Sequence, residues 1–311
     1  MNIAVIGSGL IGQAWAIVFA RGGHAVRMWD GDPAAVGKAL TLIAGQVADL
    51  QQAGLIDAPE ALLGRIQGCQ TLEEAMAGAA YVQENLPEKL EIKKEIFARM
   101  DKIAPPGTVL ASSTSSIPAS AFTAELPGRF RCLIAHPVNP PYLVPVVEIC
   151  GAPWTDPHVV QEAWDVMESV GQKPVKILRE LEGFILNRLQ GALLREAFKL
   201  VEQGYVDAEG LDVTVREGLG LRWSFMGPFE TIDLNAPDGL ADYAHRFGAM
   251  YTSIAKEQTS TEPWSEALIA KLEAQRRRVL PTDQLLARRA WRDRRLMGLA
   301  AHKKAADNEA K

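Results

Sequence analysis

The pattern of hydrophobic and polar positions divides the chain into two regions. Over the first 180 residues, short runs rich in Val, Ile and Ala alternate with stretches in which apolar residues recur at helical spacing. The runs predicted to be strands are Ile3–Ile6, Ala25–Trp29, Ala80–Val82, Thr108–Ala111, Arg131–Ala135, Val144–Ile149 and Pro174–Leu178. The helices predicted between the early runs are Leu10–Gly22, Ala34–Ala53 and Glu88–Ile103. This alternation predicts βαβ units and a mainly parallel sheet.

The pattern changes near residue 180. From Gly183 onward there is almost no period-two alternation, and apolar residues recur at helical spacing, as in Phe184, Leu186, Leu189 and Leu193. We therefore predict a doubly wound α/β domain over residues 1–182, followed by a smaller, all-helical domain over residues 183–311.

Composition narrows the class of protein. The 311 residues are 48% hydrophobic and 23% charged, which is typical of a globular protein. The net charge of -5 argues against a nucleic-acid partner. The Arg-rich segments Arg276–Arg278 and Arg288–Arg295 are accordingly interpreted as solvated helix faces.

Two further features bear on location. No apolar run approaches the ~20 residues of a membrane span, and the N-terminal NIAVIG lacks the basic start and cleavage site of a signal peptide. Cys69, Cys132 and Cys150 lack metal-ligand spacing and are typical of buried thiols in a reducing compartment. We expect a cytoplasmic protein with no metal site and no membrane partner.

A glycine-rich loop follows the first predicted strand. Residues Gly7, Gly9 and Gly12, with Leu10 and Ile11 between the last two, form G-x-G-x-x-G at the start of a predicted helix. In that context the first glycine permits a tight turn, the second lets a pyrophosphate approach the backbone, and the third lets the helix pack closely. The helix N-terminus then faces the pyrophosphate. The sequence thus predicts a Rossmann-type dinucleotide site.

Asp30 lies where the ribose-binding acid of such a site belongs. It ends the second predicted strand, close to the ~20 residues beyond Gly12 at which that acid is expected. A carboxylate there accepts the ribose hydroxyls and repels a 2′-phosphate, and no Arg adjoins it, so NAD is favoured over NADP. The alternative is a ligand-free glycine turn with a helix-capping Asp.

Polar residues follow or interrupt three of the later strands: the segments Ser112–Ser116 and His136–Pro141, and the single acid Glu148. Ligands bind at the carboxyl ends of strands in an open parallel sheet. A dehydrogenase needs a base for the hydroxyl proton, and a carboxylate on the second nitrogen of a histidine fixes its tautomer. His136 with Glu148 fits this requirement. The alternative is a turn histidine and an edge-strand glutamate.

Taken together, these segments resemble the 3-hydroxyacyl-CoA dehydrogenase family over nearly the whole chain. The matching elements are the glycine loop, Ser113-Thr114-Ser115-Ser116, His136-Pro137-Val138-Asn139-Pro140, Glu148, and Gly183-Phe184-Ile185-Leu186-Asn187-Arg188. The resemblance implies that His136 is the general base, that Glu148 orients it, and that Ser115 and Asn187 hold the substrate oxygen.

The resemblance also implies cofactor contacts and an assembly. Glu88, Lys93 and Asn139 match positions near the cofactor, although Glu88 and Lys93 also fit a solvated first helical turn. Family members are usually homodimers through the helical domain, so the resemblance implies a homodimer.

One branch of the family, that of lambda-crystallin and L-gulonate 3-dehydrogenase, is more similar than the fatty-acyl enzymes. It shares ENLPEKLEIKK, AHPVNPPYLVPVVEI, GLGLRWSFMGPFETIDLN and LARRAWRDRRLM, and carnitine dehydrogenase shares Gly220–Trp223. Ser113 replaces the Asn of the acyl enzymes, and few basic residues lie between Asp30 and Leu90 to bind a CoA nucleotide.

These departures weigh against a CoA thioester, and the resemblance to this branch implies a free 3-hydroxy acid, most of all L-gulonate, as the substrate. We interpret Arg222 as the ligand of its carboxylate, because a guanidinium matches a carboxylate in a planar fork. A packing role against Trp223 or a surface ion pair is the alternative for Arg222. Three other functions stay open: a 3-hydroxyacyl-CoA or 3-hydroxybutyryl-CoA dehydrogenase, a carnitine dehydrogenase, and a catalytically idle NAD-binding structural protein.

Overall fold

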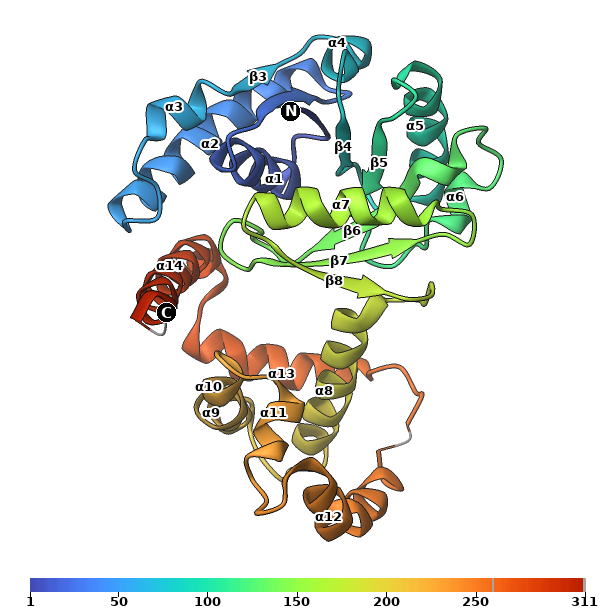
Figure 1. Cartoon of the computed structure of the whole chain (residues 1–311). Coiled ribbons are helices and arrows are strands. Elements are labelled where there is room, and N and C mark those ends of the chain that lie inside the picture. The colour runs from blue at the N-terminus through green and yellow to red at the C-terminus, as the bar shows by residue number, and fades with distance from the viewer. Residues whose placement is uncertain (259, 310–311) are drawn as a thin grey trace. The chain divides into compact units, whose positions relative to one another are not determined.

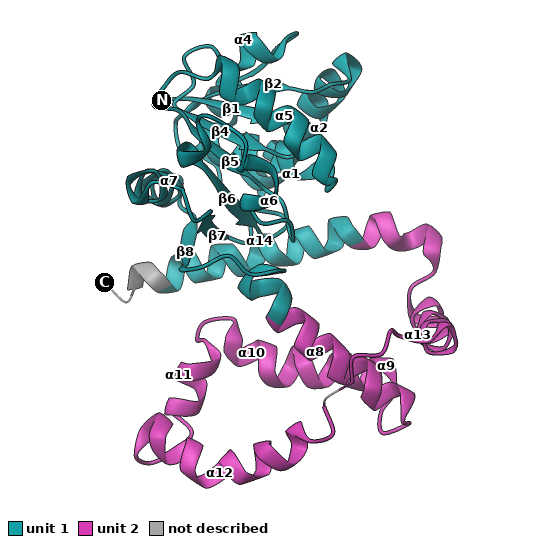
Figure 2. Ribbon diagram, turned by 90° about the vertical axis from the view of Figure 1, so that its right-hand side faces the viewer, with its two compact units in different colours: residues 1–188, 289–311 teal, residues 189–288 magenta. Residues whose placement is uncertain are grey.

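The computed structural model describes residues 1–258 and 260–309, which group into two compact units. The first unit comprises Met1–Arg188 with the described residues from Arg289 onward, and the second is Leu189–Arg288 (Figure 2). Two helices, α8 (Phe184–Glu202) and α14 (Leu285–Glu309), run from one unit into the other. The domain division expected at residues 182 and 183 therefore differs from the unit boundary and stays a prediction.

The first unit is built on one sheet, to which eight strands of the described residues belong (Figure 1). The strands are β1 (Asn2–Ile6), β2 (Ala25–Trp29), β3 (Ile66–Gly68), β4 (Tyr81–Glu84), β5 (Val109–Ser112), β6 (Cys132–Pro137), β7 (Val146–Gly151) and β8 (Lys173–Ile177). Their order is β3-β2-β1-β4-β5-β6-β7-β8. Every neighbouring pair is parallel except β6 and β7, which are antiparallel. The predicted doubly wound, mainly parallel sheet is confirmed.

Both faces of the sheet are covered by helices. The helices of this unit, besides its parts of α8 and α14, are α1 (Leu10–Arg21), α2 (Pro33–Gln52), α3 (Pro59–Leu63), α4 (Leu72–Met76), α5 (Leu90–Ile103), α6 (Ser120–Thr123), the 3₁₀ helix η1 (Arg129–Arg131) and α7 (Pro157–Ser169). Along β1, Ile3 and Val5 join the apolar cluster that contains α1, α2 and α7 residues, whereas Ala4 and Ile6 join the cluster of α4, α5 and α6. A strand buried on both faces needs a continuous apolar run, and this is why Ile3–Ile6 of β1 are all apolar.

One strand was not predicted. All seven predicted runs form strands, six of them with ends shifted by one or two residues. The eighth strand, β3, consists of Ile66, Gln67 and Gly68, each at least partly exposed. It lies at the edge of the sheet beside β2. Three residues are too short a run to show period-two alternation, so no pattern marked it.

The second unit is entirely helical in its described residues, as predicted. Besides its part of α8, it contains α9 (Ala208–Val213), the π-helix η2 (Thr214–Leu219), α10 (Gly220–Trp223), α11 (Pro228–Asp233), α12 (Gly239–Ala255), α13 (Glu266–Val279) and the 3₁₀ turn η3 (Thr282–Gln284). Its buried apolar residues, among those described, are Ala197, Val201, Ala208 and Leu268. Large apolar side chains on its surface include Leu221, Phe225, Phe229 and Leu234.

Helix length and apolarity were also compared with the needs of a membrane crossing. Among the described residues, none of the helices meets both requirements.

Candidate active site

The three glycines of the loop after β1 each meet a separate geometric demand. Gly7 has a φ of 97°, and a Cβ there would lie 2.8 Å from the carbonyl carbon of Asn85. A Cβ on Gly12 would lie 1.9 Å from the carbonyl oxygen of Gly7, so the close packing of α1 on the turn excludes any side chain. Above Gly9, by contrast, the space within 4 Å is open. The loop thus leaves room where a pyrophosphate approaches the backbone.

The start of α1 adds a favourable charge to this open space. Gly9 precedes the helix, and Leu10, its first residue, is 64% exposed. The N–H groups of the first helical turn have no acceptor inside a helix, and the helix dipole is positive there. Leu10 and Ile11 therefore present their backbone to the space that a pyrophosphate would fill, which fits a dinucleotide.

Asp30 lies beside the glycine loop, directly after β2. One oxygen, Oδ2, accepts hydrogen bonds from the Ser8 amide at 2.7 Å and the Ser8 hydroxyl at 2.8 Å, and Oδ1 accepts from the amide of Asp32 at 3.1 Å. Because β1 and β2 are parallel, with Ile6 opposite Trp29, both strands end at the same edge of the sheet. A half-buried carboxylate is therefore fixed where a ribose would follow the pyrophosphate.

His136 and Glu148 form a buried pair across two antiparallel strands. They stand directly opposite each other on β6 and β7, and His136 Nδ1 lies 2.9 Å from Glu148 Oε2. The two residues are 5% and 3% exposed. A carboxylate can only accept, so Nδ1 carries the proton, and Nε2 of the neutral imidazole is left as a base.

The second oxygen of Glu148 is held by a helix. Glu148 Oε1 accepts from the backbone amides of Ile185 and Leu186, each at 2.9 Å, in the first turn of α8. This contact explains how an acid persists inside the apolar strand β7: a hydrogen-bonded carboxylate avoids most of the cost of burial.

Ser115 and Asn187 are brought together at the end of β5. Ser115 is exposed in the loop after the strand, and the side-chain amide of Asn187 donates to its carbonyl oxygen at 2.9 Å. Since Asn187 directly follows the two amides that bind Glu148, the first turn of α8 contacts both the Ser115 loop and the histidine pair. The four residues expected to be catalytic therefore share one end of the sheet.

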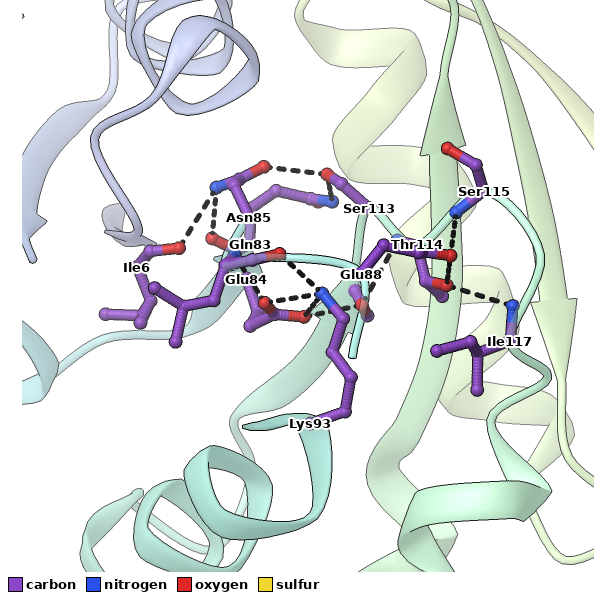
Figure 3. Close-up of polar contacts among 12 residues, drawn as sticks. Ile6, Gln83, Glu84, Asn85, Glu88, Lys93, Ser113, Thr114, Ser115 and Ile117 are labelled. Carbon is purple, nitrogen blue, oxygen red and sulfur yellow. Dashed lines mark hydrogen bonds and ion pairs between the residues drawn. The ribbon is translucent and has the colours of Figure 1, made fainter. Parts of the chain in front are cut away.

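Glu88 takes a position that the sequence did not suggest. Its Oε1 accepts from the Thr114 hydroxyl at 2.5 Å and from the Ser115 amide at 3.0 Å (Figure 3). It also accepts from the Ser116 amide at 3.0 Å and from the Ser116 hydroxyl at 3.1 Å. Burial raises the pKa of Glu88, but the hydrogen bonds from Thr114 and Ser116 and the Lys93 charge outweigh it, so the pKa lies below its ordinary value. Glu88 fixes the Ser115 loop, and its predicted cofactor contact stays a prediction.

Lys93 is not on a solvated helical turn but is 1% exposed. Its ammonium donates to both oxygens of Glu84, at 2.8 and 2.9 Å, and to the carbonyl oxygen of Leu86 at 2.9 Å (Figure 3). An ammonium has three donors, and all three point to these protein acceptors. A direct contact with the cofactor would require the release of one of them, so the structure supports a structural role for Lys93 more than the predicted one.

Glu84 is the partner that the sequence analysis missed. It ends β4, is fully buried, and also accepts from Ser112 at 2.6 Å. Burial raises its pKa, and the Lys93 charge and these hydrogen bonds oppose that shift. The sequence carried a signal for Glu84, namely an acid at the end of an apolar strand. The same position at the end of a strand had identified Asp30.

Ser113, directly after β5, takes part in a network of interior hydrogen bonds. Its hydroxyl accepts from Gln83 at 2.8 Å and donates to Asn85 at 2.7 Å (Figure 3). It also accepts from the Trp15 indole at 3.0 Å. Gln83 also donates to the carbonyl oxygen of Ala135 at 3.1 Å. The network ties α1, β4 and β5 to the residue before the histidine.

The remaining predicted site residues are less constrained. Asn139 is exposed in the turn after β6, and its cofactor contact stays a prediction. Arg222 is half-buried on α10 in the second unit, and its role toward a carboxylate stays a prediction. Across residues 1–258 and 260–309, no three His, Cys, Asp or Glu side chains are grouped to hold a metal ion.

Comparison with protein families gives two matches that together span most of the chain. Residues 2–181 match the model for the NAD binding domain of 3-hydroxyacyl-CoA dehydrogenase. Residues 183–279 match the model for the C-terminal domain of the same enzyme.

Individual relatives extend these matches. A lambda-crystallin homolog from Bos taurus is 43% identical, covering 96% of this chain and 94% of its own. An L-carnitine dehydrogenase from Streptomyces griseus is 41% identical over 81% of this chain and 75% of its own.

Two solved structures show the same architecture. An NAD+-dependent dismutase, 5-formyl-3-hydroxy-2-methylpyridine 4-carboxylic acid 5-dehydrogenase, is 28% identical, with a TM-score of 0.83 over 98% of both chains. A 3-hydroxybutyryl-CoA dehydrogenase from Escherichia coli K12 is 31% identical, with a TM-score of 0.67 over 81% of this chain and 53% of its own.

Proposed function

This chain belongs to the 3-hydroxyacyl-CoA dehydrogenase family, and we propose that it oxidises the 3-hydroxyl of a small 3-hydroxy acid with His136 as the base. The cofactor is NAD, as the matched NAD-binding domain and the fit of the glycine loop indicate. The observation that carries the proposal is the 2.9 Å contact between His136 Nδ1 and Glu148 Oε2. It leaves Nε2 of a buried, oriented imidazole available for a proton.

In this mechanism the protein handles the proton and the substrate oxygen. His136 takes the hydroxyl proton at Nε2, and the Glu148 carboxylate stabilises the imidazolium that forms. Ser115 and the second N–H of the Asn187 amide hold the substrate oxygen toward the histidine. Bound NAD+ supplies the hydride acceptor. The buried pair needs no rearrangement when its charge changes, because both oxygens of Glu148 are already bonded.

Among 3-hydroxy acids we propose L-gulonate, which would be oxidised to 3-dehydro-L-gulonate. An L-carnitine dehydrogenase that is 41% identical over 81% of this chain supports a free acid. The few basic residues between Asp30 and Leu90 argue against a CoA nucleotide. Arg222 is proposed to bind the substrate carboxylate.

We further propose a homodimer in the cytoplasm. The second unit buries few apolar side chains and exposes many, among them Phe225 at 69% and Phe229 at 74%. Apolar surface of this extent is typical of an interface with another chain. Sedimentation of the full chain at micromolar concentration tests the assembly, and a monomer would contradict it.

The test of the function is NADH formation with a panel of four substrates: L-gulonate, L-carnitine, L-3-hydroxybutyrate and L-3-hydroxybutyryl-CoA. Turnover of L-gulonate with little of the thioester is expected. Turnover of the thioester alone would keep the mechanism but overturn the argument from missing basic residues. Binding of NAD without turnover of any substrate would instead support an idle, structural protein.

Two variants assign the roles. His136→Ala is expected to lower kcat by roughly 10²–10⁴-fold and to preserve NAD binding. Arg222→Ala is expected to raise the KM of the acid, and an unchanged KM would remove Arg222 from the substrate site.

A further inference from the structure

The junction between β8 and α8 contains two consecutive residues with left-handed backbone. Gly183 has a φ of 73°, and Phe184, the first residue of α8, has a φ of 50°. Phe184 is the one non-glycine residue with positive φ within the described ranges 1–258 and 260–309. A bulky residue in this conformation is strained, and such strain persists where the surrounding structure requires it.

The left-handed backbone of Gly183 and Phe184 orients the first turn of α8 toward the His136–Glu148 pair. The next two amides, of Ile185 and Leu186, both donate to Glu148 Oε1 at 2.9 Å, and the other oxygen of Glu148 is left to His136. One carboxylate is thus divided between a helix N-terminus and an imidazole. A helix that started in another direction would lose both amide contacts.

The Phe184 side chain contacts the same histidine. It is fully buried, and its ring centroid lies 5.5 Å from that of the His136 imidazole at an interplanar angle of 39°. The strained residue therefore reaches His136 in two ways: through the backbone amides that hold Glu148, and through its own ring.

We propose that Gly183 and Phe184 are positioning residues, whose left-handed backbone and ring keep His136 protonated at Nδ1 and oriented for proton transfer at Nε2. Neither residue takes a proton or touches the reacting oxygen. The inference rests on the proposed function for its catalytic consequence, but the state of the imidazole can be observed without any substrate.

Gly183→Ala tests the backbone. A Cβ there would meet only ordinary contacts, 3.7 Å from Asn187 Cβ and 3.8 Å from Arg188 Cγ, so the substitution opposes the positive φ without a clash. Gly54→Ala is the matched control, because Gly54 has a φ of 71° with open space around its Cβ position, far from the site in sequence.

The first readout is the ¹⁵N NMR spectrum of histidine-labelled protein without substrate. The chain has five histidines, and His136→Ala identifies the signals of interest. We expect a single Nδ1–H tautomer for His136 in the wild type and in Gly54→Ala, and a mixture of tautomers in Gly183→Ala. The second readout is kcat, which should fall about tenfold in Gly183→Ala while the Kd for NAD is unchanged, since a small misplacement of a catalytic group has effects of this order.

Phe184→Leu tests the ring and serves where Gly183→Ala does not fold. Leucine keeps the Cβ and most of the apolar volume, so the backbone strain is unchanged while the aromatic contact is lost. A broadened or shifted Nδ1–H signal with a severalfold lower kcat is expected. A wild-type His136 spectrum in both variants would overturn the proposal, as would an equal change in Gly54→Ala. If the wild type oxidises none of the 3-hydroxy acids, the proposed function fails, and the spectra still decide the positioning role.

Discussion

Two buried carboxylates on the same sheet have different partners and, we infer, different roles. Glu84 at the end of β4 faces the Lys93 ammonium, and Glu148 on β7 faces the His136 imidazole. Both are almost fully buried, and both accept backbone amides in addition to their cationic or neutral partner. The difference lies in the partner: all three donors of Lys93 are used inside the protein, whereas the imidazole has a second nitrogen that Glu148 does not use.

This difference separates a structural pair from a chemical one. A buried pair whose donors are all satisfied fixes the fold around it, and losing one member leaves a charge uncompensated. A buried pair with one open atom can exchange a proton. Burial and a perturbed pKa do not by themselves distinguish a structural pair from a chemical one. The useful criterion is whether a donor or acceptor atom of the pair is left without a partner inside the protein.

The largest expected effect comes from Glu148→Gln. The amide oxygen can keep the helix amides, but its NH₂ group then donates to His136 Nδ1, which moves the imidazole proton to Nε2. We expect kcat to fall by roughly 10³–10⁴-fold, the scale of a wrong tautomer in a catalytic triad. Steady-state rates measure this, with urea unfolding as the control, which should change by only ~1 kcal/mol. A kcat near that of the wild type would show that the His136–Glu148 pair has a structural and not a catalytic role.

Glu84→Gln should act on stability instead. It leaves the Lys93 charge buried without a carboxylate, and removing one partner of such a pair costs about 3–5 kcal/mol. The double variant Glu84→Gln with Lys93→Met should recover much of this loss, because no unpaired charge remains. Urea unfolding measures both. If stability is unchanged and NAD affinity is lost, Lys93 is a cofactor ligand and the comparison of the two pairs is wrong.

The contrast also shows what the sequence could predict. His136 and Glu148 stood out because an acid interrupts an apolar strand and because the spacing matched a family. Glu84 was overlooked, since an acid at the end of YVQE is also typical of a strand that emerges into solvent. The β3 strand had too few residues for a pattern.

Other features needed coordinates because they arise from contacts distant in sequence. The donors to Glu148 come from residues 37 and 38 positions later, and they are backbone groups that every residue type carries. The contact of Glu88 with the Ser115 loop likewise joins residues 27 positions apart. Strands such as β1 and β6 were predictable because burial on both faces imposes an apolar run on the sequence. The helical second unit was predictable because its apolar residues recur at helical spacing.

Asp30 extends the comparison to a half-buried carboxylate. Asp30→Ala removes the proposed ribose contacts, and we expect the Kd for NAD to rise about 10–100-fold, as for one or two hydrogen bonds to a charged group. The substrate KM should change far less. Asp32→Ala is the matched control, because Asp32 caps α2 through Ala34 at 2.9 Å and should affect stability by about 1 kcal/mol without changing the Kd. Equal effects on cofactor and substrate would count against the ribose assignment.

The smallest effect is expected at Glu88, the exposed member of the series. Its pKa is lowered in the folded protein, so its carboxylate stabilises the fold above the pKa of the unfolded chain, about 4.3, and this contribution is lost as the pH falls through the folded pKa. Glu88→Gln keeps an acceptor for the Ser115 loop and should cost about 0.5–1 kcal/mol at neutral pH.

Urea unfolding at neutral and acid pH measures this difference. It should shrink as the pH falls below the unfolded pKa and through the lowered folded pKa of Glu88, because the wild-type carboxyl then becomes neutral like the amide. Glu91→Gln is the control, since the Glu91 side chain is 82% exposed and pairs with Lys94 on the surface of α5. It should show little difference at either pH. A Glu88 effect that persists undiminished in acid would mean that the shape of the side chain, and not its charge, holds the loop. The expected decrease of carboxylate effects with decreasing burial would then hold for Glu148, Glu84 and Asp30 but not for Glu88.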